Sequence, residues 1–190
     1  MTIKIREIRH DEAEILSKVA IETYLDTFSG LSDPDDMQAH IVEKKSPAFF
    51  RQMIATGKAI FLGAFETSGD VQKLVGYIGL CESKDNVKGR QPTKKDRALM
   101  GFYVLPSYQN KKIGKSLLDS AFEHDYFKGS DYVYLGVWDK NKIAYDFYLK
   151  YGFEIVGTYE FIVDGKVIDE DTIMICAVDK NKRPKRKEDL

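Results

Sequence analysis

Residues 109–116, Gln-Asn-Lys-Lys-Ile-Gly-Lys-Ser, gather into one short turn the group types that bind anions. The turn follows an apolar run at 99–105, stopped by Pro106, and precedes a helical apolar pattern that starts near Lys112. A strand that feeds a helix through such a turn directs unpaired backbone N–H groups and the positive end of the helix dipole at one spot. The spacing therefore predicts a phosphate-binding turn. Spacing alone leaves open the alternative of a plain strand–helix connection with surface lysines.

The composition places these residues in a globular domain with no strong overall field. The chain has 190 residues, with 29 Lys and Arg against 30 Asp and Glu, and 43% of its residues are hydrophobic. This length fits one domain with a sizeable core. The near cancellation of charge gives no global argument for a nucleic-acid or membrane partner. A local basic run at 180–187 is the one candidate for nucleic acid, and a solvated tail explains it as well.

The cysteine and histidine pattern indicates a reduced, metal-free protein. Cys81 and Cys176 lie in separate apolar runs without a metal-ligand spacing, so we expect buried free thiols. The three histidines are isolated, and no metal site is expected. The first residues do not resemble a signal peptide, and no apolar run is long enough to span a bilayer. A cytoplasmic location is the expectation.

Hydrophobic periodicity and turn residues predict a mixed α/β domain. The expected order begins with a strand at 3–9, a helix opened by an Asp11–Glu14 capping box, and helices opened by Asp33-Pro34 and Ser46-Pro47. Strands at 59–66 and 73–81 and a mobile loop at 84–96 follow, then a strand at 99–105, a helix from about Lys112, a strand at 131–138 and a helix at 142–151. The last elements are strands at 153–163 and 167–178, joined by a turn at Asp164-Gly165. We expect a largely antiparallel sheet of seven strands flanked by helices, over residues 1–178, followed by a disordered charged tail at 179–190.

Acidic residues around the second predicted helix have two interpretations. Asp33 precedes Pro34 as a helix cap, and Asp36 sits in the first turn, where negative charge complements the helix dipole. Capping is the interpretation that the local pattern favours. The alternative is an acidic rim that attracts a cationic substrate.

A second motif lies about 30 residues after the anion-binding turn. Residues 135–153, LGVWDKNKIAYDFYLKYGF, place Asn141, Ala144, Tyr148 and Gly152 after a predicted strand. Together with the strand ending at Tyr103-Val104 and its turn, this order resembles the GNAT superfamily of N-acetyltransferases. The resemblance covers residues 1–178 and is narrower for the bacterial Pai-type spermidine and spermine N-acetyltransferases.

The resemblance implies acetyl-CoA as cofactor and a sheet that is splayed between its fourth and fifth strands. The pantetheine arm of the cofactor would lie in this opening and pair with the backbone of the strand that ends at Val104. Backbone N–H groups of the following turn, with the Ser116 hydroxyl, would take the pyrophosphate. The residues assigned to the cofactor in this way are Phe102, Tyr103, Val104, Gln109, Asn110, Lys111, Lys112, Ile113, Gly114, Lys115, Ser116, Asn141, Ala144, Tyr145, Tyr148 and Tyr151.

The family also implies roles in catalysis. Tyr148 would act as general acid and protonate the leaving thiolate, although it equally fits an inward-facing core position. The Val104 backbone N–H would hold the oxyanion of the tetrahedral intermediate. Asn141 is expected to cap its helix and to contact the pantetheine.

Two positions depart from the family pattern. Lys112 occupies the place of the first motif glycine, and we expect it to take ordinary helical dihedral angles, in which lysine causes no strain. The strand at 99–104 carries no carboxylate, where many relatives have a glutamate base. Glu82 or Asp96 acting through water, or a water chain without a dedicated base, are the alternatives.

The sequence thus predicts direct transfer of an acetyl group from acetyl-CoA to a primary amine, with a polyamine such as spermidine as the favoured acceptor. Asp33, Asp36 and Glu82 are the candidate acceptor-binding residues. A protein N-terminal or lysine acetyltransferase is the alternative within the same class, and a non-catalytic CoA-binding regulator is the alternative outside it. A homodimer through the final strands, with apolar Ile168, Ile173, Met174 and Ile175, competes with simple core packing of those residues.

Overall fold

The computed structural model describes residues 2–30, 33–69, 71–83, 88–163 and 166–184. Its backbone forms two compact units, the first made of Met1–Cys81 and Met100–His124 and the second of Glu82–Leu99 and Asp125–Leu190. The predicted turn at 164–165, the start of the loop predicted at 84–96 and residues 185–190 of the predicted tail lie outside the described residues.

The strands follow one order, β1-β2-β3-β5-β6-β8-β7-β4. Seven of them are the predicted strands, namely β1 (Thr2–Glu7), β2 (Ala59–Ser68), β3 (Val71–Glu82), β5 (Arg97–Val104), β6 (Tyr132–Trp138), β7 (Glu154–Val163) and β8 (Lys166–Ala177). The eighth, β4 (Lys88–Gly89), is a two-residue strand paired with β7. β5 and β6 pair in parallel through Arg97↔Val133 and Ala98↔Tyr134. The predicted fold class is confirmed.

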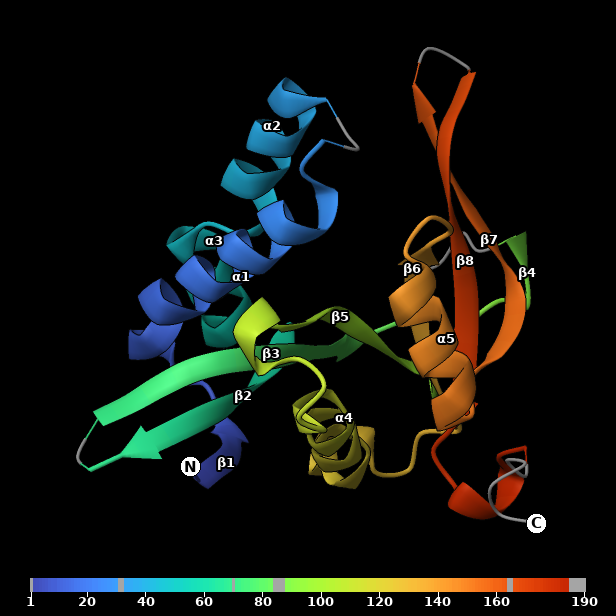
Figure 1. Ribbon diagram of the computed structural model, residues 1–190. Helices are drawn as coiled ribbons and strands as arrows, with labels where there is room; N and C mark the ends of the chain where they lie inside the picture. The colour runs from blue at the N-terminus through green and yellow to red at the C-terminus, as the bar shows by residue number, and fades with distance from the viewer. Residues whose placement is uncertain (1, 31–32, 70, 84–87, 164–165, 185–190) are drawn as a thin grey trace. The chain divides into compact units, whose positions relative to one another are not determined.

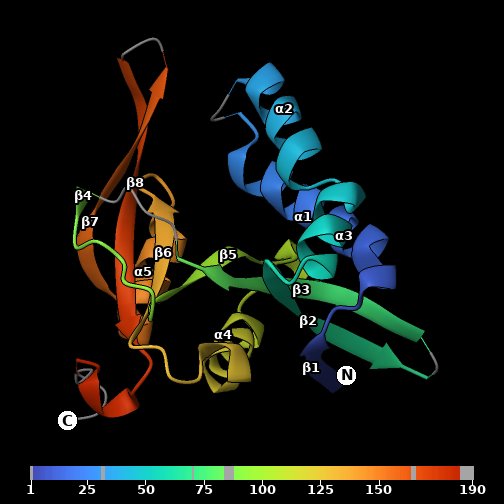
Figure 2. The ribbon, with the colours of Figure 1, turned by 180° about the vertical axis from the view of Figure 1, so that it is seen from behind.

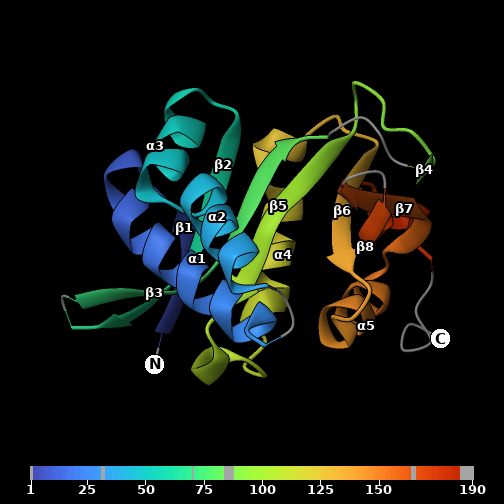
Figure 3. The same ribbon diagram turned by 90° about the horizontal axis from the view of Figure 1, so that it is seen from above.

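In the first unit, helices cover both faces of the β1-β2-β3 strands (Figures 1 and 3). One face carries α1 (Ala13–Phe28), α2 (Pro34–Lys44) and α3 (Pro47–Ala55), and the other carries α4 (Ile113–Glu123). The largest side chains buried between these layers are Tyr77, Phe61, Phe65, Leu16, Ile78, Leu80, Leu117 and Leu118. Apolar burial of this kind stabilises each layer and fixes β5 and the start of α4 on it.

Helix starts in the first unit follow the sequence signals with one exception. Asp33 Oδ1 accepts from the backbone N–H groups of Asp35 (2.9 Å) and Asp36 (3.4 Å), and Ser46 Oγ accepts from the N–H of Phe49 (3.3 Å), as predicted. The predicted Asp11–Glu14 capping box is wrong.

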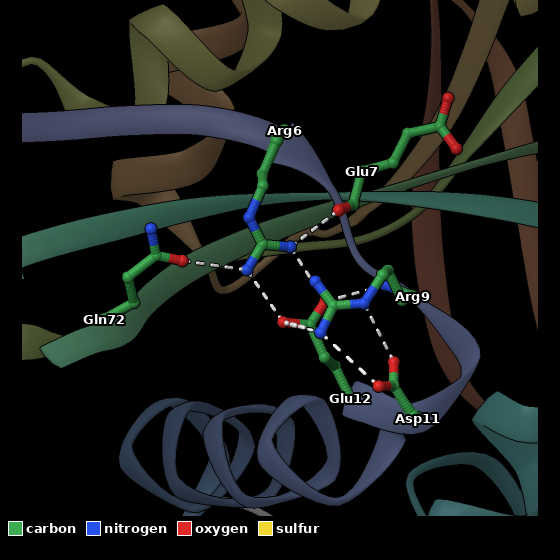
Figure 4. A network of polar contacts seen from close by, with 6 residues as sticks. All are labelled: Arg6, Glu7, Arg9, Asp11, Glu12 and Gln72. Atoms are coloured by element: carbon green, nitrogen blue, oxygen red, sulfur yellow. Dashed lines mark hydrogen bonds and ion pairs between the residues drawn. The ribbon is translucent and has the colours of Figure 1, made fainter. Parts of the chain in front are cut away.

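Glu12 caps this segment instead (Figure 4). Its carboxylate accepts from the Arg9 N–H (2.9 Å) and pairs at 2.7 and 2.8 Å with the two terminal nitrogens of Arg6 in β1. These hydrogen bonds hold the pKa of Glu12 below its ordinary value. The tertiary partner Arg6 explains why the local pattern misplaced the cap.

In the second unit, Figure 2 shows β6, β8, β7 and β4 side by side in that order. β8 pairs antiparallel with β6 over the whole of β6, and with β7. Helix α5 (Lys142–Tyr151) packs on β6. Ile173, Met174 and Ile175 are buried within this unit, so core packing accounts for them, and the side chain of Ile168 is outside the description.

The beginning of the predicted tail is folded. Lys180–Lys182 form a 3-10 turn, and the Arg183 guanidinium donates to the carbonyl oxygen of Ala177 (2.8 Å) and lies 5.5 Å from the Tyr151 ring centre. Folded structure therefore continues past the predicted boundary at residue 178. The cysteines are free and buried, as predicted. Among the described residues, no helix has the length and apolar character needed to cross a membrane.

Candidate functional site

The turn between β5 and α4 is tied to the end of the strand. The N–H of Leu105 donates to the carbonyl of Val75 in β3 (2.9 Å), and a 3-10 turn at Pro106–Tyr108 follows. The Gln109 side-chain amide donates back to the carbonyl oxygen of Val104 (3.1 Å). These bonds fix where the following backbone N–H groups point.

The turn and the first residues of α4 present a run of unused donors. Within the described residues, the backbone N–H groups of 110–115 donate to no protein acceptor. Asn110 (φ 60°) and Lys112 (φ 62°) are both left-handed, which curls the backbone around this spot. With the positive end of the α4 dipole, this arrangement can bind a phosphate group.

The expectation for Lys112 is wrong. Lys112 precedes α4 as its cap residue, with φ 62° and ψ 7°, and does not take helical dihedral angles. A left-handed lysine costs about 1 kcal/mol that glycine does not. The turn geometry associated with the family's glycine is therefore kept here at the expense of strain.

Fewer donors are available to an anion than the sequence predicts. The Gln109 N–H donates to the carbonyl of Pro106 (3.2 Å), and both the N–H (3.0 Å) and the hydroxyl (3.2 Å) of Ser116 donate to the carbonyl of Lys112. Ser116 therefore closes the first turn of α4, because its donors are satisfied internally. The donors available to an anion are those of residues 110–115.

The lysines of this turn are exposed and differ in their partners. Lys115 pairs with Asp119 one helical turn on (2.6 Å), and the Lys111 ammonium lies 4.8 Å from the Tyr108 ring centre. Such surface contacts are weak, so both side chains can turn toward a bound anion.

The strand residues predicted to pair with the pantetheine lie after a glycine that the sequence analysis missed. Gly101 has φ +70° in the middle of β5, and Phe102, Tyr103 and Val104 after it are half-buried. A β-carbon on Gly79 of β3 would meet the Met100 carbonyl at 2.2 Å, so glycine is required for β3 to approach here. A glycine inside an apolar strand pattern was the available signal.

In the second unit, Asn141 caps α5 as predicted. Its side-chain oxygen accepts from the N–H of Ala144 (3.2 Å). Gly152 ends the helix in a left-handed conformation (φ 109°), which the glycine in the Tyr151-Gly152-Phe153 sequence allows.

Tyr148 lies on the buried side of α5, 8% exposed. Its ring meets Phe153 at 5.4 Å and Phe147 at 5.6 Å between centres, both edge to face. This packing fixes the ring orientation, which both a core residue and a positioned acid require. Tyr151 is buried beside Phe153, whereas Tyr145 is half-buried with Lys142 5.3 Å from its ring centre.

The acidic candidates belong to different units of the chain. Asp33 and Asp36 are exposed at the start of α2 in the first unit, and Glu82 is exposed in the second. Asp96 is 1% exposed and accepts from the N–H groups of Thr93 (2.7 Å) and Tyr132 (3.2 Å). These bonds fix the loop before β5, and the suggested role of Asp96 as a water-linked base stays a prediction.

Residues 21–153 match the acetyltransferase (GNAT) family, and the chain belongs to that family. Membership confirms the predicted enzyme class, an N-acetyltransferase, and acetyl-CoA as its cofactor.

Individual relatives agree with this assignment. A spermidine N(1)-acetyltransferase of Thermoplasma acidophilum is 30% identical over 172 residues, which cover 87% of this chain and 98% of the relative. The PaiA N-acetyltransferase of that organism, solved in complex with coenzyme A, superposes with a TM-score of 0.72 at 29% identity, over 93% of this chain and 99% of that one. A GNAT-family acetyltransferase of Staphylococcus aureus Mu50 shares the fold at 24% identity and a TM-score of 0.66, over 93% and 99% of the two chains.

Proposed function

We propose that this enzyme transfers the acetyl group of acetyl-CoA directly to a primary amine of a polyamine such as spermidine. The observation that carries the proposal is the run of unpaired N–H donors at 110–115, set on a left-handed turn at the start of α4, in a chain of the acetyltransferase family. The polyamine is supported by the relative of 30% identity that is named a spermidine acetyltransferase.

The donor run and the nearby lysines are assigned to the pyrophosphate of the cofactor. Successive N–H groups bind phosphate oxygens by short, charge-assisted hydrogen bonds, and Lys111 adds charge at the same turn. The backbone of Phe102, Tyr103 and Val104, which the family resemblance assigns to the pantetheine, directly precedes this turn. We assign the oxyanion of the reaction to the Val104 N–H.

Tyr148 is assigned as general acid for the departing sulfur. A phenol has a pKa near that of the thiol it would protonate, so proton transfer needs little driving force. Its fixed ring orientation between Phe147 and Phe153 supports this role, since a proton donor must be held in place. Asn141 is assigned a contact with the pantetheine in addition to its cap.

The acceptor is assigned to the side of the first unit where α2 begins. Asp36 is exposed there. Burial raises the pKa of Tyr24 in α1, and the negative charge of Asp36 adds to this effect, so Asp36 acts across the two helices. A polycation gains from such charges during approach. Asp33 contributes through its charge while one of its oxygens caps α2, and Glu82 is a further candidate.

A free-thiol release assay with acetyl-CoA tests the proposal. We expect turnover with spermidine and spermine well above hydrolysis, weaker turnover with a monoamine of similar length, and none with a tertiary amine. The acetylated product, identified by mass, must carry one added acetyl group on a primary amine. Turnover no greater than hydrolysis with every polyamine would remove the substrate assignment.

Two observations favour a second candidate, a CoA-binding regulator without catalysis. Lys112 holds a strained left-handed conformation in the binding turn, and β5 carries no carboxylate base. Calorimetry that detects CoA binding, combined with no turnover across an amine panel, would support this alternative over catalysis.

A further inference from the structure

Lys45 is a lysine whose side chain the first unit buries. It follows α2 as its cap residue and is 7% exposed. Its N–H donates to the Ile41 carbonyl (3.0 Å), and its own carbonyl accepts from the Ser17 hydroxyl of α1 (2.6 Å). Both backbone groups are therefore fixed, and the side chain leaves from a rigid point.

The Lys45 ammonium lies among aromatic rings instead of carboxylates. Its Nζ is 5.0 Å from the ring centre of Tyr24 in α1 and 5.6 Å from that of Tyr103 in β5. Among the described residues, no acidic side chain pairs with it and no acceptor takes its hydrogen bonds, although Nζ is not fully enclosed. A buried lysine without a counter-ion costs stability, so its presence calls for another role.

The other titratable groups around Lys45 are neutral or turned to solvent. His40 stacks on Tyr24 at 4.9 Å, and burial and then the Lys45 charge lower the pKa of His40 to about 4. Burial raises the pKa of Tyr24, helped by Asp36, and that of Tyr77, which lies under Tyr103. The exposed neighbours Glu43 and Lys44 pair with each other (2.5 Å). Burial lowers the pKa of Lys45 itself to about 8, so it can be neutral and basic near that pH.

We propose that the neutral amine of Lys45 is the general base of the acetyl transfer. The sequence offers no carboxylate for this role on the strand at 99–104. The inference rests on the proposed function. Its ground is that Lys45 Nζ lies 5.6 Å from the ring centre of Tyr103, on the strand assigned to the cofactor, and pairs with no acceptor among the described residues.

The proton balance closes without a further reactant. Lys45 takes one proton from the substrate's ammonium group, and the freed amine forms the C–N bond as the C–S bond breaks. The sulfur receives the hydroxyl proton of Tyr148 as it leaves. The second proton of the nitrogen is released as the amide forms, and it restores the Tyr148 hydroxyl. The ammonium, the thioester and neutral Lys45 thus become the amide, the thiol and protonated Lys45, which then returns its proton to solvent.

The test compares Lys45→Met with a matched control, Lys44→Met. Methionine has a similar length and suits burial, so we expect Lys45→Met to fold, as checked by circular dichroism. With spermidine at pH 8, we expect kcat/KM to fall about 100-fold in Lys45→Met and to stay within about twofold in Lys44→Met. Lys45→Arg serves as a second variant, because it keeps the charge and cannot release a proton near that pH.

The pH profile separates a base from a packing residue. In the wild type, kcat/KM should rise with pH and level off above about 8. In Lys45→Met, kcat/KM should rise with pH without levelling off near 8, because this variant can use only substrate whose amine is already deprotonated in solution. A profile of unchanged shape in Lys45→Met, or full activity in Lys45→Arg, would overturn the base assignment while leaving the acetyltransferase proposal standing. Absence of wild-type turnover with every amine would overturn both.

Discussion

At the scale of single residues, Tyr148 is the position where packing and chemistry make different predictions. Tyr148→Phe keeps the edge-to-face contacts with Phe147 and Phe153 and removes only the hydroxyl. We expect kcat for acetyl transfer to fall about 100-fold, with the Kd for CoA unchanged within about twofold, because an acid acts in the transition state. Steady-state kinetics and calorimetry measure the two quantities. Tyr132→Phe, a half-buried tyrosine of β6, is the control. A Tyr148→Phe enzyme with wild-type kcat would leave Tyr148 a core residue.

Lys112 tests how much backbone strain the binding turn holds. Lys112→Gly should raise the free energy of unfolding by about 0.5–1 kcal/mol, because glycine adopts φ 62° without a clash. Lys112→Ala removes the same charge and keeps the β-carbon, so it should give no such gain. Urea unfolding of both variants isolates the backbone effect, and equal stability of the two would mean that the turn is unstrained.

Lys45 makes the stability of the protein depend on pH in alkaline solution. Its pKa is about 8 in the folded protein against 10.5 ordinarily, so between these values the unfolded chain binds more protons. Stability relative to Lys45→Met should therefore be lowest below pH 8 and rise toward pH 10.5, on the order of 2–3 kcal/mol in all. Urea midpoints of both proteins at pH 7, 8, 9 and 10 measure the difference. A difference that does not change with pH would mean that burial leaves the lysine unperturbed.

These residues also show where prediction from sequence ends. The motif around Asn141 and Tyr148 is local, so its spacing predicted both the cap and the helix face. The sequence shows lysine in place of glycine at 112, but the sign of φ there depends on how β5 and α4 are held by the core. Lys45 carries no pattern at all, because only the packing of α1 and β5 over it removes it from water.

At the scale of elements, the junction of β1 and α1 depends on Glu12 (Figure 4). Its pKa is lowered by the Arg6 hydrogen bonds, so its contribution is complete above its ordinary pKa of 4.5 and is lost as pH falls below that value. Glu12→Gln should therefore lower the free energy of unfolding by about 1–3 kcal/mol at pH 7 and by clearly less at pH 3. Asp11→Asn, which alters an exposed pair with Arg9, is the control and should change little. Equal losses at both pH values would show that the carboxylate charge is not what Arg6 stabilises.

Element prediction succeeded where the signal was periodic and failed where the partner was distant. In the part of the chain that the structure describes, the seven longer strands and the five α-helices follow their apolar patterns and turn residues to within a few positions. β4 was missed because two residues have no period, and only pairing with Thr158 and Gly157 defines it. The capping error at Asp11 has a related origin, since the partner Arg6 lies in β1, outside the local capping pattern.

At the scale of the whole molecule, positive and negative charges nearly balance, so a polyanion can be attracted only by groups close to its binding site. The net charge of −1 gives no long-range attraction for a cofactor rich in phosphate. Attraction must come at short range from the N–H donors at 110–115 and from the lysines of this turn. Salt screens the charges of these exposed lysines.

The stability of the whole chain then reports this local site. CoA at about 100 times its Kd should stabilise the folded state by about 2.7 kcal/mol, which raises Tm by about 5–10 °C for a chain of this size. Pantetheine, which lacks every phosphate, should give a much smaller shift at equal concentration. The CoA shift should shrink between 50 and 500 mM salt, and any pantetheine shift should stay constant, because only the former involves charge. Equal shifts for the two ligands, independent of salt, would remove the phosphate role from the turn before α4 and with it the main support for the assigned cofactor contacts.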